Sequence, residues 1–297
     1  MDVGLTGATG SIGCRLLRLL LADPDVTTVR TVARRPLPPM AKLVHVKADL
    51  CDPAARRALE GVDVLWHLAF QLWRSGGSNQ LGPVNVEGTE NVLAGGPGRV
   101  VFASSAAVYG AWPDNPLPLT EAHPPRPNRQ VTYATEKLQA ERRCLDAAPT
   151  AVLRLSAVLG PHADARVRRA AQGYRLAIPV VRGARQALQF LDENDAATAL
   201  HRAGKSSATG VFNVATDDWL DQDDIARLSG GRVVRLPLMA MLRGSEVAAR
   251  LRLLPFGADR AVLLNGPLAM DPAAAGAAFA WRPTHRSDEV LTRFLCQ

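Results

Sequence analysis

Residues 2–13 read DVGLTGATGSIG, and this stretch decides the fold of the chain. A short apolar run breaks into three glycines, Gly7, Gly10 and Gly13, and apolar residues at helical spacing follow directly. Such a pattern predicts a strand, a tight turn and a helix in immediate succession.

The three glycines have separate uses in a turn of this kind. The first allows a positive φ, the second lets the backbone approach a pyrophosphate, and the third lets helix and strand pack closely. Free N–H groups at the start of the helix then face the phosphates. A glycine-rich turn without a ligand is the alternative, but a strand directly before and a helix directly after favour a dinucleotide site. The predicted cofactor contacts here are Gly7, Thr9, Gly10, Ser11, Ile12 and Gly13.

Composition limits the class of protein. The chain has 297 residues, of which 47% are hydrophobic, enough for one large α/β domain or a domain with a smaller lobe. The net charge is +7, but acidic residues are scattered throughout and no block of Lys and Arg reaches about five, so nucleic acid is not an expected partner.

Cysteine and histidine usage argues against a metal or disulfide scaffold. The four cysteines are far apart, and the six histidines have no metal-ligand spacing, so no metal is expected. No run reaches about 18 apolar residues, and a strand starting at residue 2 leaves no room for a cleaved leader. We therefore expect a cytoplasmic protein without a membrane span.

Strands alternate with helical segments along the chain, which predicts an α/β fold with a Rossmann-like, doubly wound parallel sheet. The expected strands are 2–6, 26–32, 44–48, 64–69, 100–103, 152–155 and 211–214. A dinucleotide-binding domain is expected over 1–160 with a return segment at about 189–215. A smaller, mostly C-terminal substrate-binding lobe is expected over 161–188 and 216–297.

The second strand ends in Ala33-Arg34-Arg35, at the place where a dinucleotide fold meets the adenosine ribose. An acid there would accept hydrogen bonds from the 2′-hydroxyl, whereas an arginine offers donors and charge to a 2′-phosphate. Arg34 therefore points to NADP(H), with NAD possible. A solvated arginine pair is the alternative.

Tyr133 and Lys137 are four residues apart on an expected helix, so their side chains share one face. A phenol with a pKa of about 10 is a poor base at neutral pH, but an adjacent ammonium lowers that pKa. Tyr133 could then exchange a proton with a carbonyl or alcohol oxygen. Ser105, at the end of the fifth strand, could hydrogen-bond the same oxygen. A tyrosine and a lysine on a solvated face are the alternative.

The motifs occur in an order that resembles the extended short-chain dehydrogenase/reductases, a family that includes sugar epimerases and dehydratases. These motifs are TGATGSIG, Asp49-Leu50, HLA at 67–69, NVEGT, SSAAVYG, YATEK, VLRLSAVLGP and VFNVA, and they cover residues 1–215. The resemblance implies catalytic roles for Ser105, Tyr133 and Lys137, and a contact of Lys137 with the nicotinamide ribose.

The resemblance also implies further cofactor and partner contacts. Asp49 and Leu50 are expected beside the adenine ring, and Ala69 in the segment that passes under the cofactor. Related enzymes often dimerise through amphipathic helices, so a homodimer through the Tyr133 helix is expected.

Two departures from the family concern the substrate. Members that act on nucleotide sugars commonly have an Asn within the segment that reads LSAV at 155–158 here, and an arginine where this chain has Leu188. Arg182 or Arg185 could still contact a diphosphate. We therefore predict an NADP(H)-preferring oxidoreductase that acts on a small carbonyl or alcohol. The alternatives are an epimerase or dehydratase acting on a (nucleotide) sugar, and a non-catalytic NADP(H)-sensing regulator, which would not need Ser105, Tyr133 and Lys137 together.

Overall fold

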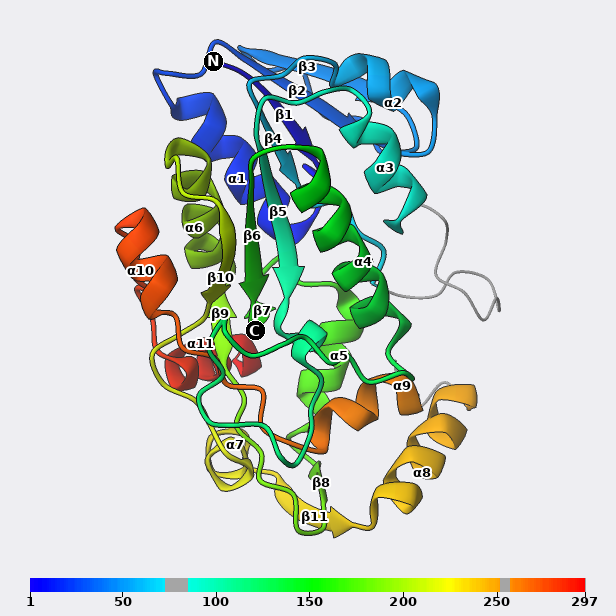
Figure 1. Cartoon of the computed structure of the whole chain (residues 1–297). Coiled ribbons are helices and arrows are strands. Elements are labelled where there is room, and N and C mark those ends of the chain that lie inside the picture. The colour runs from blue at the N-terminus through cyan, green and yellow to red at the C-terminus, as the bar shows by residue number, and fades with distance from the viewer. Residues whose placement is uncertain (73–84, 252–256, 297) are drawn as a thin grey trace.

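The computed structural model describes residues 1–72, 85–251 and 257–296, and its centre is a parallel sheet (Figure 1). Seven strands lie in the order β10-β6-β5-β4-β1-β2-β3. They are β1 Asp2–Thr6, β2 Thr28–Ala33, β3 Leu43–Lys47, β4 Val64–His67, β5 Val100–Ser105, β6 Thr150–Leu155 and β10 Gly210–Val214. The order runs outward in both directions from the β1/β4 pair, and the carboxyl ends of such strands form a crevice for ligands.

Helices cover both faces of the sheet, which confirms the predicted doubly wound architecture. One face packs against α1 (Ser11–Ala22), α6 (Glu193–Lys205) and α10 (Ala273–Phe279). The other face packs against α2 (Pro53–Ala58), α3 (Glu87–Leu93) and α4 (Thr132–Ala147). Trp66 in β4 is fully buried in the first layer, and its indole donates to the carbonyl of Leu200 at 2.7 Å.

The remaining elements gather beyond the carboxyl ends of the strands, and the arrows of β5 and β6 point toward them (Figure 1). Two small parallel pairs join β8 (Ala177–Val181) to β11 (Arg232–Leu236) and β7 (Ala157–Leu159) to β9 (Phe190–Asp192). The other elements are α5 Ala165–Gly173, α7 Gln222–Ser229, α8 Leu238–Arg250, α9 Ala258–Ala261, α11 Ser287–Leu295 and the 3-10 turns η2 Ala106–Tyr109 and η3 Val262–Leu264. We call α5, β8, α7, β11, α8 and α9 the lobe.

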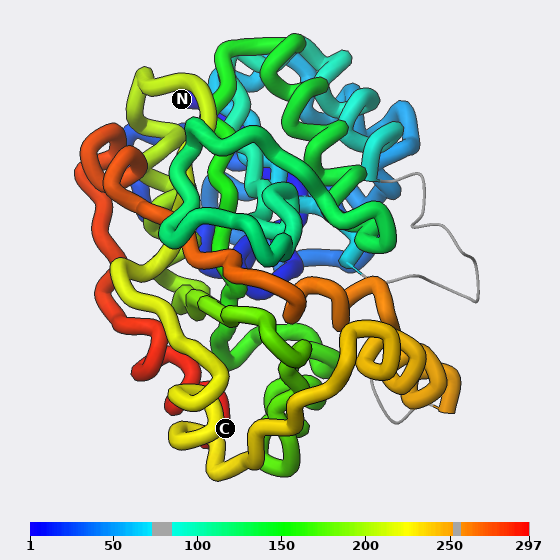
Figure 2. Tube along the Cα trace, turned by 60° about the horizontal axis from the view of Figure 1, so that its bottom comes forward, coloured from blue at the N-terminus to red at the C-terminus, as the bar shows by residue number. Residues whose placement is uncertain are grey.

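The C-terminal part of the chain connects the two halves. In Figure 2 the orange segment that contains α9 and η3 crosses between the sheet domain and the yellow elements of the lobe. No helix among the described residues is long and apolar enough to cross a bilayer.

The observed strands agree with the expected ones except at their ends. β2 begins at Thr28 and not at residue 26, and β6 begins at Thr150 and not at residue 152, because Thr150 already pairs with Val100. The short strands β7, β8, β9 and β11 were not predicted. The residue bounds of the two expected domains stay a prediction.

A candidate active site at the carboxyl end of the sheet

The glycine turn forms a cradle at the start of α1. Gly7 has a φ of +77°, and a Cβ there would stand 2.7 Å from the backbone nitrogen of Ala69. A Cβ on Gly13 would stand 2.0 Å from the carbonyl oxygen of Gly7. The N-cap of α1 is Gly10, which makes no side-chain cap, and the first turn carries no acidic residue. The N–H groups at the start of α1 are uncapped, and the glycine turn leaves them open to a ligand. Such a helix start can bind a pyrophosphate.

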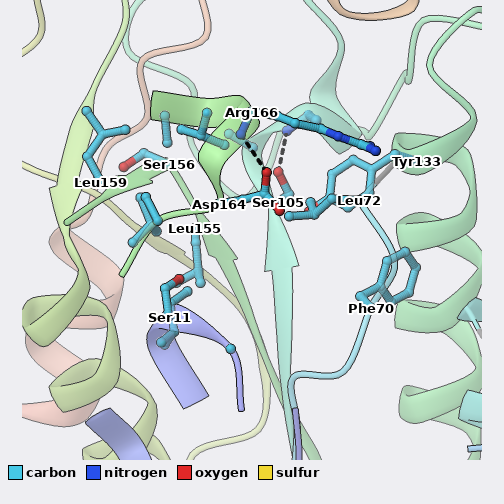
Figure 3. Close-up of a pocket in the computed structure, with 18 of the residues that line it drawn as sticks. Ser11, Phe70, Leu72, Ser105, Tyr133, Leu155, Ser156, Leu159, Asp164 and Arg166 are labelled. Carbon is cyan, nitrogen blue, oxygen red and sulfur yellow. Dashed lines mark hydrogen bonds between the residues drawn. The ribbon is translucent and has the colours of Figure 1, made fainter. Parts of the chain in front are cut away.

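The cradle opens into a cavity of about 1040 Å³ that reaches the lobe. Figure 3 shows Ser105 near the centre of the cavity, with Tyr133 to its right and Ser11 at the lower left. Among the predicted site residues, those that line the cavity are Thr9, Gly10, Ser11, Ile12, Arg34, Ser105 and Tyr133. Those that do not line it are Gly7, Gly13, Asp49, Leu50, Ala69 and Lys137.

Some of these residues serve local structure. The Asp49 carboxylate accepts a hydrogen bond from the backbone N–H of Cys51 at 3.1 Å, and Leu50 is buried in the layer below α3. Arg34 and Arg35 are exposed at the rim of the cavity, directly after β2.

Tyr133 projects from the first turn of α4 toward the end of β5. Burial raises the pKa of Tyr133, and the charge of Arg260 and a hydrogen bond with Ser105 act in the opposite direction. Ser105 Oγ accepts the backbone N–H of Ala107 at 3.2 Å. A hydroxyl has one proton, and in the hydrogen bond that favours ionised Tyr133 the hydroxyl of Ser105 donates it to the phenolate oxygen.

Lys137 lies one turn further along α4, behind the cavity wall, with only 3% of its surface exposed. Its Nζ donates to the carbonyl of Ala103 at 2.5 Å and stands 3.7 Å from the centroid of the Phe70 ring. Its distance to the centroid of the Tyr133 ring is 5.9 Å. Burial lowers the pKa of Lys137 to about 7. The lysine is thus near the tyrosine, but its hydrogen bond goes to β5.

His67 is a buried histidine of β4. Thr6 Oγ1 accepts two backbone N–H groups at the end of β4 and therefore donates its proton to Nδ1 of His67 at 2.7 Å. The other ring nitrogen, Nε2, then donates to Thr89 Oγ1 at 2.8 Å. Burial lowers the pKa of His67 to about 3, so the ring is neutral. Both of its nitrogens have hydrogen-bond partners.

A buried ion pair under the site escaped the sequence reasoning. Glu141, one turn beyond Lys137 on α4, receives Nε and Nη2 of Arg154 from β6 at 3.1 and 2.8 Å. Ser104 Oγ donates to the same carboxylate at 2.5 Å. The repeated spacing of four residues from Tyr133 through Lys137 to Glu141 was a signal that could have found it.

Toward the lobe, apolar and polar side chains both line the cavity. The apolar ones include Leu155, Val158, Leu159, Val167, Leu188, Phe190, Leu263, Leu264 and Leu268. The carboxamide of Gln189 also lines the cavity, but it is held by the backbone of Thr216 and Met270.

The arginines that line the lobe side of the cavity differ from the two that the sequence suggested as diphosphate contacts. Arg182 and Arg185 do not line the cavity, whereas Arg166 and Arg260 do. Arg260 reaches in from α9, far from the glycine motif in sequence, and no sequence pattern marked it. Among the described residues, no group of three His, Cys, Asp or Glu side chains could hold a metal ion.

The chain is similar in sequence to a known family and to individual proteins. A sequence model of the NAD dependent epimerase/dehydratase family matches residues 3–215. An uncharacterised protein of Mycobacterium tuberculosis (strain ATCC 25618 / H37Rv) is 31% identical over 254 residues, which are 78% of this chain and 67% of that protein. The N-acetyl-alpha-D-glucosaminyl-diphospho-ditrans,octacis-undecaprenol 4-epimerase of Escherichia coli O157:H7 is 34% identical over 157 residues, 50% of this chain and 45% of that enzyme.

Solved structures share the whole fold. MoeE5 in complex with UDP-glucose and NAD matches with a TM-score of 0.72 at 22% identity, over 99% of this chain and 97% of that one. At this identity the likeness supports the fold and not a substrate.

Proposed function

Because the chain belongs to the NAD dependent epimerase/dehydratase family of the extended short-chain dehydrogenase/reductases, we propose that it interconverts a secondary alcohol and a ketone with NADP(H). One observation carries this proposal. Ser105 and Tyr133 meet at the end of β5, in the same cavity that holds the uncapped start of α1. A hydride carrier and an acid/base group would thus share one chamber.

Each residue has a role in this proposal. The backbone of the glycine turn binds the pyrophosphate, and Lys137 binds the nicotinamide ribose when the cofactor displaces its contact with Ala103. In alcohol oxidation the ionised Tyr133 would take the hydroxyl proton of the substrate. Ser105 donates its hydrogen bond to the reacting oxygen. The cofactor, when bound, supplies the hydride acceptor.

The preference for NADP(H) is supported by Arg34 at the rim. We expect Arg34→Ala to weaken NADP(H) binding about 10- to 100-fold, the loss typical of a charge-assisted contact, and to leave NAD(H) affinity unchanged. Titration calorimetry with both cofactors measures this. Arg57→Ala, an exposed arginine on α2 outside the cavity, is the matched control. Equal losses for both cofactors in Arg34→Ala would contradict a 2′-phosphate contact.

The residues in the cavity wall support a net reaction between NADP(H) and a ketone or alcohol. The leucines of the wall, Leu188 among them, favour a carbonyl compound with an apolar part, and Arg166 and Arg260 add positive charge beside it. We therefore expect free NADPH to be consumed in proportion to product when a panel of cyclic and aliphatic ketones is supplied. Absorbance of NADPH at equilibrium and during turnover checks this.

A sugar epimerase or dehydratase is the second candidate, favoured by the 34% identity with the 4-epimerase over half of the chain. Such an enzyme regenerates its cofactor within each cycle. Conversion of UDP-glucose or another nucleotide sugar without net change in free NAD(P)H would establish this candidate and exclude net redox chemistry.

A further inference from the structure

Arg260 lies against the ring of Tyr133. Its Cζ is 4.7 Å from the ring centroid, and 16% of its side chain is exposed. Its Nη2 donates to the carbonyl of Leu72 at 2.7 Å, so the guanidinium is held between α9, α4 and the segment that follows β4. From this geometry we propose that Arg260 supplies a fixed positive charge that favours the ionised form of Tyr133.

The proposal rests on the acid/base role proposed for Tyr133 and adds how that role is sustained. Arg260 acts through the tyrosine, so it is a positioning residue and not a catalytic one. An opposite charge beside a phenol favours its ionised form, more so where water is excluded.

Lys137 alone is poorly suited to this task. Its Nζ stands farther from the ring, at 5.9 Å, and donates to the carbonyl of Ala103. Burial also lowers the pKa of Lys137 to about 7, so the lysine loses its charge at a lower pH than an arginine does. A guanidinium keeps its charge at any pH that an enzyme meets. Arg260 therefore compensates for a lysine that titrates.

Several other charged side chains lie near Tyr133. Among the described residues they are Glu136 and Lys137 on α4, Asp259 beside Arg260, and His162, Asp164 and Arg166 on the cavity wall. Glu136 is engaged by Asn85 at 2.6 Å, and the Asp259 carboxylate stands 3.9 Å from Nε of Arg260. Arg260 is the charge whose guanidinium stacks on the phenol ring.

Arg260 and Tyr133 belong to different parts of the fold. Arg260 comes from α9 of the lobe, while Tyr133 belongs to the sheet domain. The positive charge lies against the phenol ring only while α9 holds Arg260 next to Tyr133. Ionisation of Tyr133 is thereby linked to the position of the lobe.

The test is a direct titration of Tyr133, which needs neither substrate nor cofactor. The chain has only three tyrosines, so the ultraviolet difference absorbance of phenolate in Tyr133→Phe isolates the contribution of that one residue. We expect Arg260→Met to raise the ionisation midpoint of Tyr133 by about 1 to 2 pH units. Arg260→Lys, which keeps a charge, should retain most of the wild-type midpoint.

Two further variants make the test decisive. Arg168→Met removes an arginine that stacks on Phe294 at 5.8 Å, outside the cavity, and should leave the Tyr133 midpoint unchanged. Arg260→Gln is a second neutral variant that keeps a donor for Leu72, in case Arg260→Met does not fold. An unchanged midpoint in a folded neutral variant would overturn the proposal. The proposed function is tested separately, by net turnover of NAD(P)H, and its failure would leave the titration of Tyr133 unaffected.

Discussion

Tyr133→Phe is expected to lower kcat by about 10²- to 10⁴-fold, the usual contribution of a general acid or base. The substitution removes one oxygen and keeps the ring, which packs edge-on against Phe70 at 5.7 Å between centroids. Cofactor affinity should therefore stay within a few fold of wild type. Single-turnover kinetics measure the chemical step, and titration calorimetry measures binding.

The matched control is Tyr109→Phe. This tyrosine is also buried, but its hydroxyl donates to Asn213 at 2.8 Å, away from the cavity. The control should cost stability while kcat stays close to that of wild type. Unchanged turnover in Tyr133→Phe would refute the assignment. A loss of cofactor binding that matched the loss of turnover would show that the tyrosine serves binding alone.

The glycine turn and the strand-end serine could be read from sequence because local rules fix them. Gly7 needs a positive φ, Gly13 has no space for a Cβ, and Ser105 ends a buried strand. The meeting of Tyr133 with Ser105 follows once α4 packs beside β5. These features depend on short-range geometry and on the common direction of parallel strands.

Other features depend on contacts between distant segments. Arg260 reaches Tyr133 only through the packing of α9, and nothing near residue 260 marks it as part of a site. β8 and β11 are strands of five residues that pair across a long stretch of sequence, and a short run of this kind does not by itself indicate a strand. Sequence reasoning also assigned the effect on Tyr133 to Lys137, although the lysine hydrogen-bonds Ala103.

The homodimer and the cytoplasmic location stay predictions. The helix expected at the dimer interface, α4, has several polar or charged residues on its exposed face, with Leu145 as an exposed apolar side chain. Sedimentation of the full chain would measure its association state.

Breaking the buried ion pair between Arg154 and Glu141 is expected to lower the stability of the protein strongly. Both side chains are almost fully buried, at 4% and 2% exposure, and the pair ties α4 to β6. Burial would lower the pKa of Arg154, but the hydrogen bond and charge of Glu141 raise it above its ordinary value. Breaking such a pair leaves one buried charge without its partner. We expect Arg154→Met to lower the free energy of unfolding by about 3 to 5 kcal/mol, measured by chemical denaturation.

An exposed pair that joins α4 to α3 is the matched control. Arg143 contacts Glu90 at 2.8 Å with about half of each side chain exposed, and Arg143→Met should cost about 1 kcal/mol or less. The double variant Arg154→Met/Glu141→Leu should recover much of the stability that Arg154→Met loses, because no buried charge remains. If the double variant is as unstable as the sum of its single variants, the pair is not coupled. Since Tyr133, Lys137 and Glu141 share one face of α4, a stable double variant with reduced kcat and unchanged cofactor affinity would show that the pair also sets the position of the tyrosine.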